Sequence, residues 1–374
     1  MRALIINSYA GSITIGAHAI DGLEVRASLE DDDFGGAVQR ANFPNMPFYP
    51  YRKDWPAWDL SDTVVIAHPP CSAFSLLTTK SARGTGAAAF ACTKEILDYA
   101  MGHKALAIGI ESVMGALNGA WAVHQEYADR HGYHIYRLLE NGCMFGAQWR
   151  ERFWAVWVRK GAAAPDLPVA LTPRWSTVAQ TVGDADGPSP SQLDHELARY
   201  IGRLTARGLD DAAIERLLEP RETTRTLGRI LWDQRLSHLV YPSDDARKAA
   251  KQTLANEWLG DKGFSGGVTV LGSRGTSPVL LGSSNWVYDG RPLPERGFTR
   301  LMGFPDDYIW PEPPASKRNF RAQVRTYLSK GVMPQVATWL IENVCAHVFG
   351  TPRQHHVEGP GSYAVTCPPN GIAD

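Results

Sequence analysis

Short apolar runs alternate with amphipathic stretches over the first 160 residues of the chain. Runs at 2–7, 23–29, 64–67 and 105–110 predict buried strands, and an alternating run predicts a further strand at 133–139. Between them, the spacing of apolar positions predicts helices near 13–17, 90–102 and 119–131. A strand followed by a small-residue turn and a helix is the repeating unit of a Rossmann-like fold. We therefore predict an α/β protein with a mostly parallel sheet and helices on both faces.

The pattern changes at about residue 160. The stretch up to about 290 is richer in Pro, Gly, Ser, Thr and Arg and has only short periodicities, and an amphipathic helix is predicted at the end of the segment that runs to 348. We predict one domain from 1–160 that is completed by 291–350, a smaller domain at 161–290, and a flexible tail at 351–374. The last helix is expected to return and pack beside the first strand.

Composition and charge narrow the class of protein. The 374 residues are 44% hydrophobic and 21% charged, as in a soluble globular protein, and no apolar run is long enough to span a membrane. Five scattered cysteines without CxxC spacing argue against a disulfide framework and a structural zinc, so we expect no metal and a cytoplasmic setting. The net charge of −1 gives no overall sign of nucleic-acid binding, so any DNA-facing surface must come from local segregation of charge.

One cysteine stands at a position suited to chemistry. The buried run 64–67 ends at His68-Pro69-Pro70, so Cys71 is expected at the carboxyl end of a strand, the edge where ligands bind in open α/β sheets. A buried structural cysteine is the alternative. The stretch after it lacks helical periodicity and predicts a loop, in which Lys80 and Arg83 are available for phosphates.

Polar residues follow several other predicted strands. The small-residue turn of Tyr9, Ala10, Gly11 and Ser12 follows the first strand, and Glu30 follows the second, placed to bind ribose hydroxyls unless it belongs to a solvated acidic turn. Asp54 is placed near a third strand edge, where its carboxylate would meet an adenine amino group. Glu111 is expected on the same edge as Cys71.

Two arginines lie two residues apart at the start of another predicted strand. Arg150 and Arg152 therefore share one face, and two guanidiniums on one face need anionic partners. A surface salt bridge is one interpretation, and a carboxylate or phosphate ligand is the other.

Five motifs occur in order along the chain and together resemble those of the DNA (cytosine-5) methyltransferase family. They are Pro70-Cys71-Ser72-Ala73-Phe74-Ser75, Glu111-Ser112-Val113, Gln148-Trp149-Arg150-Glu151-Arg152, Gly303-Phe304-Pro305-Asp306-Asp307-Tyr308 and Ser329-Lys330-Gly331-Val332-Met333-Pro334. The resemblance spans about 4 to 348 and implies the class I methyltransferase fold. It makes 1–160 with 291–350 the catalytic and cofactor-binding domain, and 161–290 the target-recognition domain.

The resemblance also implies a mechanism. Cys71 would add to C6 of a flipped-out cytosine, so that C5 can take an alkyl group from S-adenosyl-L-methionine or a related cofactor. Glu111 would protonate N3, which requires a raised carboxyl pKa, with Arg150 and Arg152 holding the base, the carboxylate or a phosphate. The implied cofactor contacts are Tyr9, Ala10, Gly11, Ser12, Glu30, Asp54, Pro70, Ser329 and Lys330. The implied contacts to double-stranded DNA are Ser75, Lys80, Arg83 and Gln148, and we expect a monomer.

The departures from the family pattern suggest an unusual donor. A single glycine, Gly11, keeps its place in the first turn, Ser112 replaces an Asn, and Lys330 stands where the closing motif has Asn. A second positive charge near a sulfonium is unfavourable unless an anion joins it. A DNA phosphate, a nearby Glu or outward snorkelling would account for Lys330. So would a cofactor with its own carboxylate, carboxy-S-adenosyl-L-methionine, in which case the product is 5-carboxymethylcytosine rather than 5-methylcytosine.

Three functions therefore remain open: a DNA cytosine C5 alkyltransferase, a catalytically silent DNA-binding relative, and an RNA cytosine methyltransferase. Cys71, Glu111 and Arg152 together favour an enzyme, and the length of 161–290 favours duplex DNA. A cysteine hydrolase is disfavoured, because nothing in the sequence pairs His68 with the thiol.

Overall fold

The structure is a computed structural model. It describes residues 1–50, 54–75, 83–163, 167–169, 176, 178–182, 268–271, 277, 279–280, 285–288, 291–311, 320–352 and 363–364, with scattered positions between 202 and 249. Lys80 lies outside the described residues.

A seven-stranded sheet in the order β3-β2-β1-β4-β5-β7-β6 forms the centre of the molecule. Its strands are β1 (Arg2–Ile6), β2 (Glu24–Leu29), β3 (Phe48–Tyr49), β4 (Thr63–Ala67), β5 (Ala107–Ser112), β6 (Tyr133–Asn141) and β7 (Glu151–Arg159). The pairings from β3 to β5 are parallel, whereas β7 is antiparallel to both β5 and β6. The Rossmann-like α/β prediction is confirmed, with one strand reversed.

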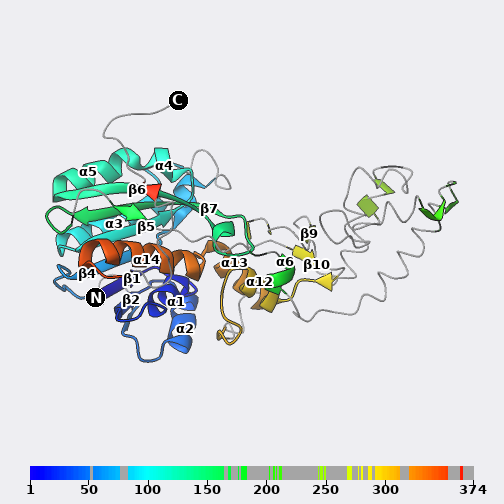
Figure 1. The fold of residues 1–374 in the computed structure, drawn as a ribbon, viewed down its shortest axis with the longest axis horizontal. Coiled ribbons are helices and arrows are strands. Elements are labelled where there is room, and N and C mark those ends of the chain that lie inside the picture. Colours follow the sequence, from blue (N-terminus) through cyan, green and yellow to red (C-terminus); the bar gives the residue numbers. More distant parts are fainter. Residues whose placement is uncertain are drawn as a thin grey trace.

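Helices cover both faces of this sheet (Figure 1). Within the described ranges the α-helices are α1 (Ser12–His18), α2 (Asp33–Asn42), α3 (Ala88–Gly102), α4 (Ala116–Gly119), α5 (Trp121–His131), α6 (Val178–Val182), α12 (Glu295–Leu301), α13 (Phe320–Lys330) and α14 (Pro334–Phe349). Successive residues of β1 face opposite layers: Ile5 packs in the layer that includes α1 and α14, while Leu4 and Ile6 pack in the layer that includes α3 and α5. Both faces of the strand are therefore buried, which explains its continuous apolar run.

The last helix returns to the sheet, as expected, but its main neighbours are α1, β4 and β5 rather than β1. A Cβ on Gly16 would lie 2.6 Å from the Pro334 carbonyl oxygen and 2.7 Å from the Ala337 Cβ, so glycine is what allows α1 and α14 to approach so closely. The Thr338 hydroxyl donates to the Gly16 carbonyl at 3.1 Å. This contact ties α14 to α1, the helix that follows the turn after β1.

Short strands join the returning segment to the middle of the chain. A small sheet has the order β11 (Arg291–Pro292), β10 (Asn285–Tyr288), β9 (Val268–Leu271), and β8 (Pro168–Val169) pairs with β12 (Tyr363–Ala364). Helix α6 packs on α12, where Val178 and Val182 join the same core as Phe298. In the described part of the chain, no helix is long and apolar enough to cross a membrane.

Candidate active site

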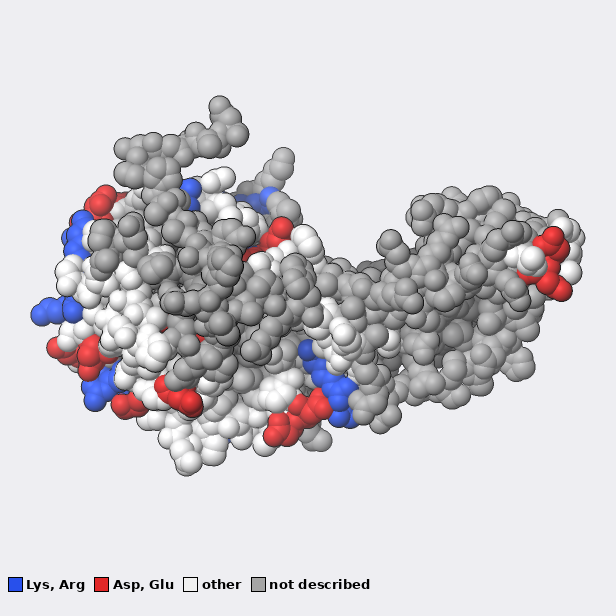
Figure 2. Space-filling model, viewed as in Figure 1, with Lys and Arg blue, Asp and Glu red and all other residues white. Residues whose placement is uncertain are grey.

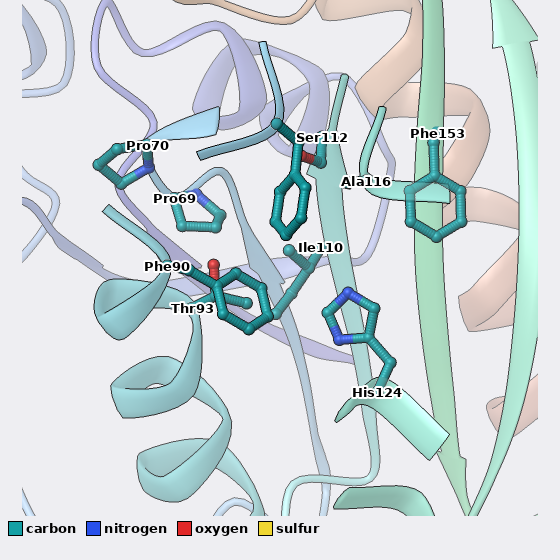
Figure 3. Close-up of a pocket in the computed structure, with 10 residues that line it drawn as sticks. Pro69, Pro70, Phe90, Thr93, Ile110, Ser112, Ala116, His124 and Phe153 are labelled. Atoms are coloured by element: carbon teal, nitrogen blue, oxygen red, sulfur yellow. The ribbon is translucent and has the colours of Figure 1, made fainter. Parts of the chain in front are cut away.

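The cysteine follows β4 on a short rigid platform. The His68 amide donates to the Ile6 carbonyl at 3.0 Å, and Pro69-Pro70 then leads into a 3-10 turn, Cys71–Phe74, in which Cys71 is half-buried. Prolines fix φ in this approach and so limit the positions that the thiol can take. A small cavity lies behind the platform (Figure 3). It is lined by Pro69, Pro70, Phe74, Phe90, Thr93, Ile110, Ser112, Ala116, His124 and Phe153.

A buried carboxylate connects the cysteine platform with β7. Glu111 is fully buried in β5; its Oε2 lies 3.0 Å from His68 Nε2, and its Oε1 lies 2.9 Å from Arg152 Nε. The Cys71 side chain is close enough to His68 to act on its charge, and His68 Nδ1 has no hydrogen-bond partner among the described residues. Cys71, His68, Glu111 and Arg152 therefore form one connected group.

The electrostatics of this group differ from the expectation for Glu111. Burial by itself would raise the pKa of Glu111, but His68, Arg152 and Arg150 outweigh it and hold that pKa below its ordinary value. Burial disfavours the charged form of His68, yet its interactions with Glu111 and Cys71 raise its pKa to about 9. The expected raised carboxyl pKa of Glu111 is therefore wrong for this state, and the proton resides on His68.

Arg150 has a different role from Arg152. Arg150 is 2% exposed, and its Nη2 donates to the carbonyl oxygens of Ser329 at 3.0 Å and Gly331 at 2.6 Å. Burial and the neighbouring Arg152 lower its pKa to about 9. Glu140 lies opposite Arg152 in the strand register, and burial, helped by the charge of Glu111, raises its pKa to about 8. Arg150 thus links the sheet to the closing motif, while Arg152 holds Glu111.

The reversed direction of β7 explains why these groups meet. Because β7 is antiparallel to β5, its amino end lies at the carboxyl edge of the parallel strands. Glu111 pairs with Trp154 in the register and Glu140 with Arg152, so the arginines that precede and begin β7 lie at this edge. Residues that are far apart in the sequence are thereby brought to the same edge as Cys71.

The turn after β1 has features of a site for a small polar ligand. The Tyr9 amide donates to Glu30 Oε2 at 2.7 Å, and Glu30 is fully buried, with burial raising its pKa to about 8. Gly11 has φ +81, and a Cβ there would lie 2.5 Å from the Tyr308 hydroxyl, which donates to the Ala10 carbonyl. The buried Ser12 hydroxyl has no hydrogen-bond partner in the described part of the chain.

A cavity lies at the carboxyl ends of β2 and β3, beside Glu30. Its lining is Glu30, Asp32, Asp33, Gly36, Arg40, Phe48 and Pro50. Polar groups beside an aromatic wall fit the adenosine part of the cofactor that the fold implies. Asp54 is exposed and does not line this cavity, so the structure does not bring it together with Glu30.

The closing motif places Lys330 beside the same turn. Lys330 is the last residue of α13, and its Nζ lies 5.6 Å from the ring centre of Tyr9 and 5.3 Å from that of Tyr327. Among the described residues, no carboxylate lies within 4.0 Å of this ammonium group. The Ser329 hydroxyl donates to the Thr326 carbonyl at 2.7 Å, so it is engaged within its own helix.

The residues predicted to contact DNA are less clearly brought together into one group than those around Glu111. Ser75 is half-buried at the end of the cysteine turn, and Arg83 is half-buried a few residues before α3. Gln148 is fully buried, and its backbone forms a bridge with Ser277. On the face shown in Figure 2, the described acidic and basic side chains are interspersed. That face therefore presents no basic patch among the residues that the structure describes.

Three residues of the site were missed or left unassigned in the sequence. His68 precedes the cysteine motif, Tyr308 ends a motif whose position in the site was not predicted, and Glu140 lies within an alternating strand. The one signal for His68 in the sequence is its position as a polar residue directly after the predicted strand at 64–67. Among the described residues, no group of three or more His, Cys, Asp or Glu is arranged to hold a metal ion.

Sheet order, reversed β7 and the cysteine at the carboxyl edge define a class, the Rossmann-like methyltransferases. The chain belongs to the C-5 cytosine-specific DNA methylase family, whose model matches residues 1–346. No curated protein matches the sequence.

Solved structures resemble this one over nearly its whole length. A DNA modification methyltransferase encoded within an Escherichia coli prophage has a TM-score of 0.58 at 15% identity, covering 93% of this chain and 99% of its own. The Entamoeba histolytica methyltransferase EhMeth has a TM-score of 0.56 at 10% identity, with 92% and 98% covered. The Dnmt2 methyltransferase of Schizosaccharomyces pombe has a TM-score of 0.52 at 13% identity, with 94% and 99% covered. At these identities the likeness shows the fold alone.

Proposed function

We propose that this protein is a DNA cytosine-5 alkyltransferase that flips its target cytosine out of the duplex and attacks it with Cys71. The observation that supports this most is the connected group of Cys71, His68, Glu111 and Arg152 at the carboxyl edge of the sheet.

The chain's own residues account for activation of the base. The Cys71 sulfur bonds to C6, the C5=C6 π pair moves to C4–C5, and the electron pair of C4=N3 moves onto N3, which takes a proton through Glu111. Arg152 holds Glu111 in position at 2.9 Å. C5 then carries enough electron density to react with the electrophilic carbon that an S-adenosylmethionine-type cofactor supplies. The base must leave the stack for this chemistry, because C6 is not accessible within a duplex.

The residues that would hold the cofactor are the turn from Tyr9 to Ser12, Glu30, Pro70 and the segment at Ser329-Lys330, with Asp54 as a further predicted contact. The buried Ser12 hydroxyl without a partner and the polar cavity beside Glu30 support this placement. The Tyr308 hydroxyl braces the turn at Ala10. Ser75, Lys80, Arg83 and Gln148 stay as predicted DNA contacts, and 161–290 as the predicted recognition domain of a protein that acts as a monomer.

We further propose that Lys330 lets the enzyme accept carboxy-S-adenosyl-L-methionine and form 5-carboxymethylcytosine. The ammonium lies over the faces of Tyr9 and Tyr327, next to the turn, and no carboxylate among the described residues neutralises it. An anionic group on the carbon to be transferred would meet this charge in a charge-assisted contact. Ordinary methyl transfer from S-adenosyl-L-methionine to give 5-methylcytosine is the alternative.

Competition between the two donors tests both the proposed transfer to cytosine C5 and the proposed use of the carboxylated donor. The purified protein is given duplex DNA with equal amounts of the two cofactors, and the DNA is digested to nucleosides for mass spectrometry. We expect 5-carboxymethylcytosine from the wild type and a shift toward 5-methylcytosine in Lys330→Asn. The matched control is Lys160→Asn, an exposed lysine just after β7, at the opposite edge of the sheet.

The possible outcomes separate the hypotheses. If the wild type and Lys330→Asn both give 5-methylcytosine only, the donor proposal is overturned and the cytosine-5 transferase stands. Modified cytosine in an RNA substrate but not in DNA would favour the RNA enzyme. Intact DNA binding without any modified base would favour the silent relative.

A further inference from the structure

His68 occupies a position that the cysteine motif does not explain. Its side chain is 2% exposed and lies between three groups: Glu111 from β5, Cys71 from the 3-10 turn, and Tyr9 from the turn after β1. The Tyr9 ring meets it edge-on, with ring centres 5.1 Å apart. Arg152 from β7 and the more distant Arg150 and Glu140 act on it through Glu111.

The charges of the free site leave Glu111 without a proton to give. Two cations, His68 and Arg152, contact its two oxygens, so the ionised form of the carboxylate is stabilised. Addition of a thiolate to C6 nevertheless requires that N3 receive a proton. Of the two cations in contact with Glu111, the imidazolium is far more acidic than the guanidinium of Arg152, and its proton lies between His68 Nε2 and Glu111 Oε2, across 3.0 Å.

We propose that His68 is a positioning residue that supplies, through Glu111, the proton that N3 of the cytosine takes up. This inference rests on the proposed function. As the S–C6 bond forms, the Nε2 proton of the imidazolium moves to Glu111 and a carboxyl proton moves to N3, which leaves Glu111 ionised and His68 neutral. When the S–C6 bond later breaks, the N3 proton returns by the same route and recharges His68. Protons and charge balance over the two steps, and release of the C5 proton is separate.

The contacts of His68 predict the pH at which this proton relay, from His68 through Glu111 to N3, stops working. Burial opposes its charge, but the interactions with Glu111 and Cys71 raise the pKa of His68 to about 9. A group with a raised pKa is fully charged well below that value and loses its proton as the pH rises through it. The single-turnover rate of the wild type should therefore fall as the pH rises through about 9.

The test combines a pH profile with a direct titration. His68→Gln keeps a hydrogen-bond donor toward Glu111 but holds no titratable proton. We expect a loss of about 10²-fold in single-turnover rate, the lower end of what a general acid contributes. We also expect the alkaline limb of the pH–rate profile, its fall at high pH, to disappear. In histidine-labelled protein, NMR should show one imidazole that titrates near 9 and is missing in His68→Gln.

His124→Gln is the matched control, because His124 is also 2% exposed but has its pKa lowered to about 4 by burial. This variant should keep the alkaline limb. Arg150 also loses charge near 9, but it is intact in His68→Gln, so an alkaline limb that persists in His68→Gln belongs to Arg150 and overturns the proposal.

The NMR titration does not depend on substrate. If the protein modifies no cytosine but His68 titrates near 9, the proposed function fails and the protonated state of His68 stands. If transfer proceeds and His68 titrates near its ordinary value, the relay fails and the function stands.

Discussion

Replacing Glu111 by Gln tests the electrostatic account of the site directly. His68 and His124 are equally buried, at 2% exposure, yet the pKa of His68 is raised to about 9 and that of His124 lowered to about 4. His68 has a carboxylate 3.0 Å away, whereas the shift of His124 comes from burial. In Glu111→Gln, His68 should therefore behave like His124 and be neutral near pH 7.

The size of the effect follows from the pKa of His68. A rise from 6.5 to about 9 corresponds to about 3 kcal/mol of stabilisation, at about 1.4 kcal/mol per unit. That figure agrees with the effect of breaking a buried ion pair, about 3–5 kcal/mol. Because the folded-state pKa is raised, the contribution is complete below pH 6.5 and is lost as the pH rises through about 9.

Urea unfolding of the wild type and Glu111→Gln, at one pH below 6.5 and one above 9, measures this contribution. The free-energy difference between the two proteins should be at least about 3 kcal/mol larger at the lower pH, because a neutral His68 in the variant also loses stability below pH 6.5. Titrations of groups that Glu111 does not influence cancel in this difference, whereas those of Glu140 and Arg150 change with Glu111 and are followed separately. Equal differences at the two pH values would refute the reasoning, because they would mean that His68 carries no charge supplied by Glu111.

Three further variants test the rest of the site. Cys71→Ser should abolish transfer while DNA binding is kept, and only the wild type should form a covalent complex with DNA that contains 5-fluorocytosine; trapping by the variant would contradict the assignment. Arg152→Ala frees one oxygen of the buried carboxylate and should lower turnover by about 10²-fold, and normal turnover would remove it from the site. Gly11→Ala places a Cβ 2.5 Å from the Tyr308 hydroxyl and should weaken cofactor binding, as measured by calorimetry. The control is Gly22→Ala, where φ is +72 and no atom lies within 4 Å, and its effect should be smaller. Equal effects of the two variants would leave backbone strain as the whole explanation.

The local pattern of apolar and polar residues was sufficient to predict the positions of most strands and helices in the sheet domain. The apolar runs predicted at 2–7, 23–29 and 64–67 are β1, β2 and β4 to within a residue or two, because strands buried on both faces leave a continuous apolar record. The predicted helix at 119–131 is α5 to within two residues, whereas the short helix α4 directly before it was not predicted. Where a helix breaks depends on packing, here of Gly115 and Gly119 against Phe74, and such contacts leave no periodic signal.

The carboxyl ends of the strands could also be found from the sequence, because the residue pattern by itself places Cys71 and Glu111 at one edge of the sheet. The partners of these groups could not. Arg152 reaches Glu111 because β7 runs antiparallel to β5, and the sequence of a strand does not state its direction in the sheet.

The charge of Glu111 shows the same division. Its residue type and place follow from the sequence, but whether its pKa rises or falls depends on which cations share its burial. Burial by itself raises the pKa of a carboxyl group, and contact with His68 and Arg152 reverses that direction. The sequence by itself determined the family, the nucleophile and the edge of the sheet where chemistry takes place. Only the tertiary structure decided where the proton resides, because that depends on distances of about 3 Å between residues that are 43 and 41 positions apart in the chain.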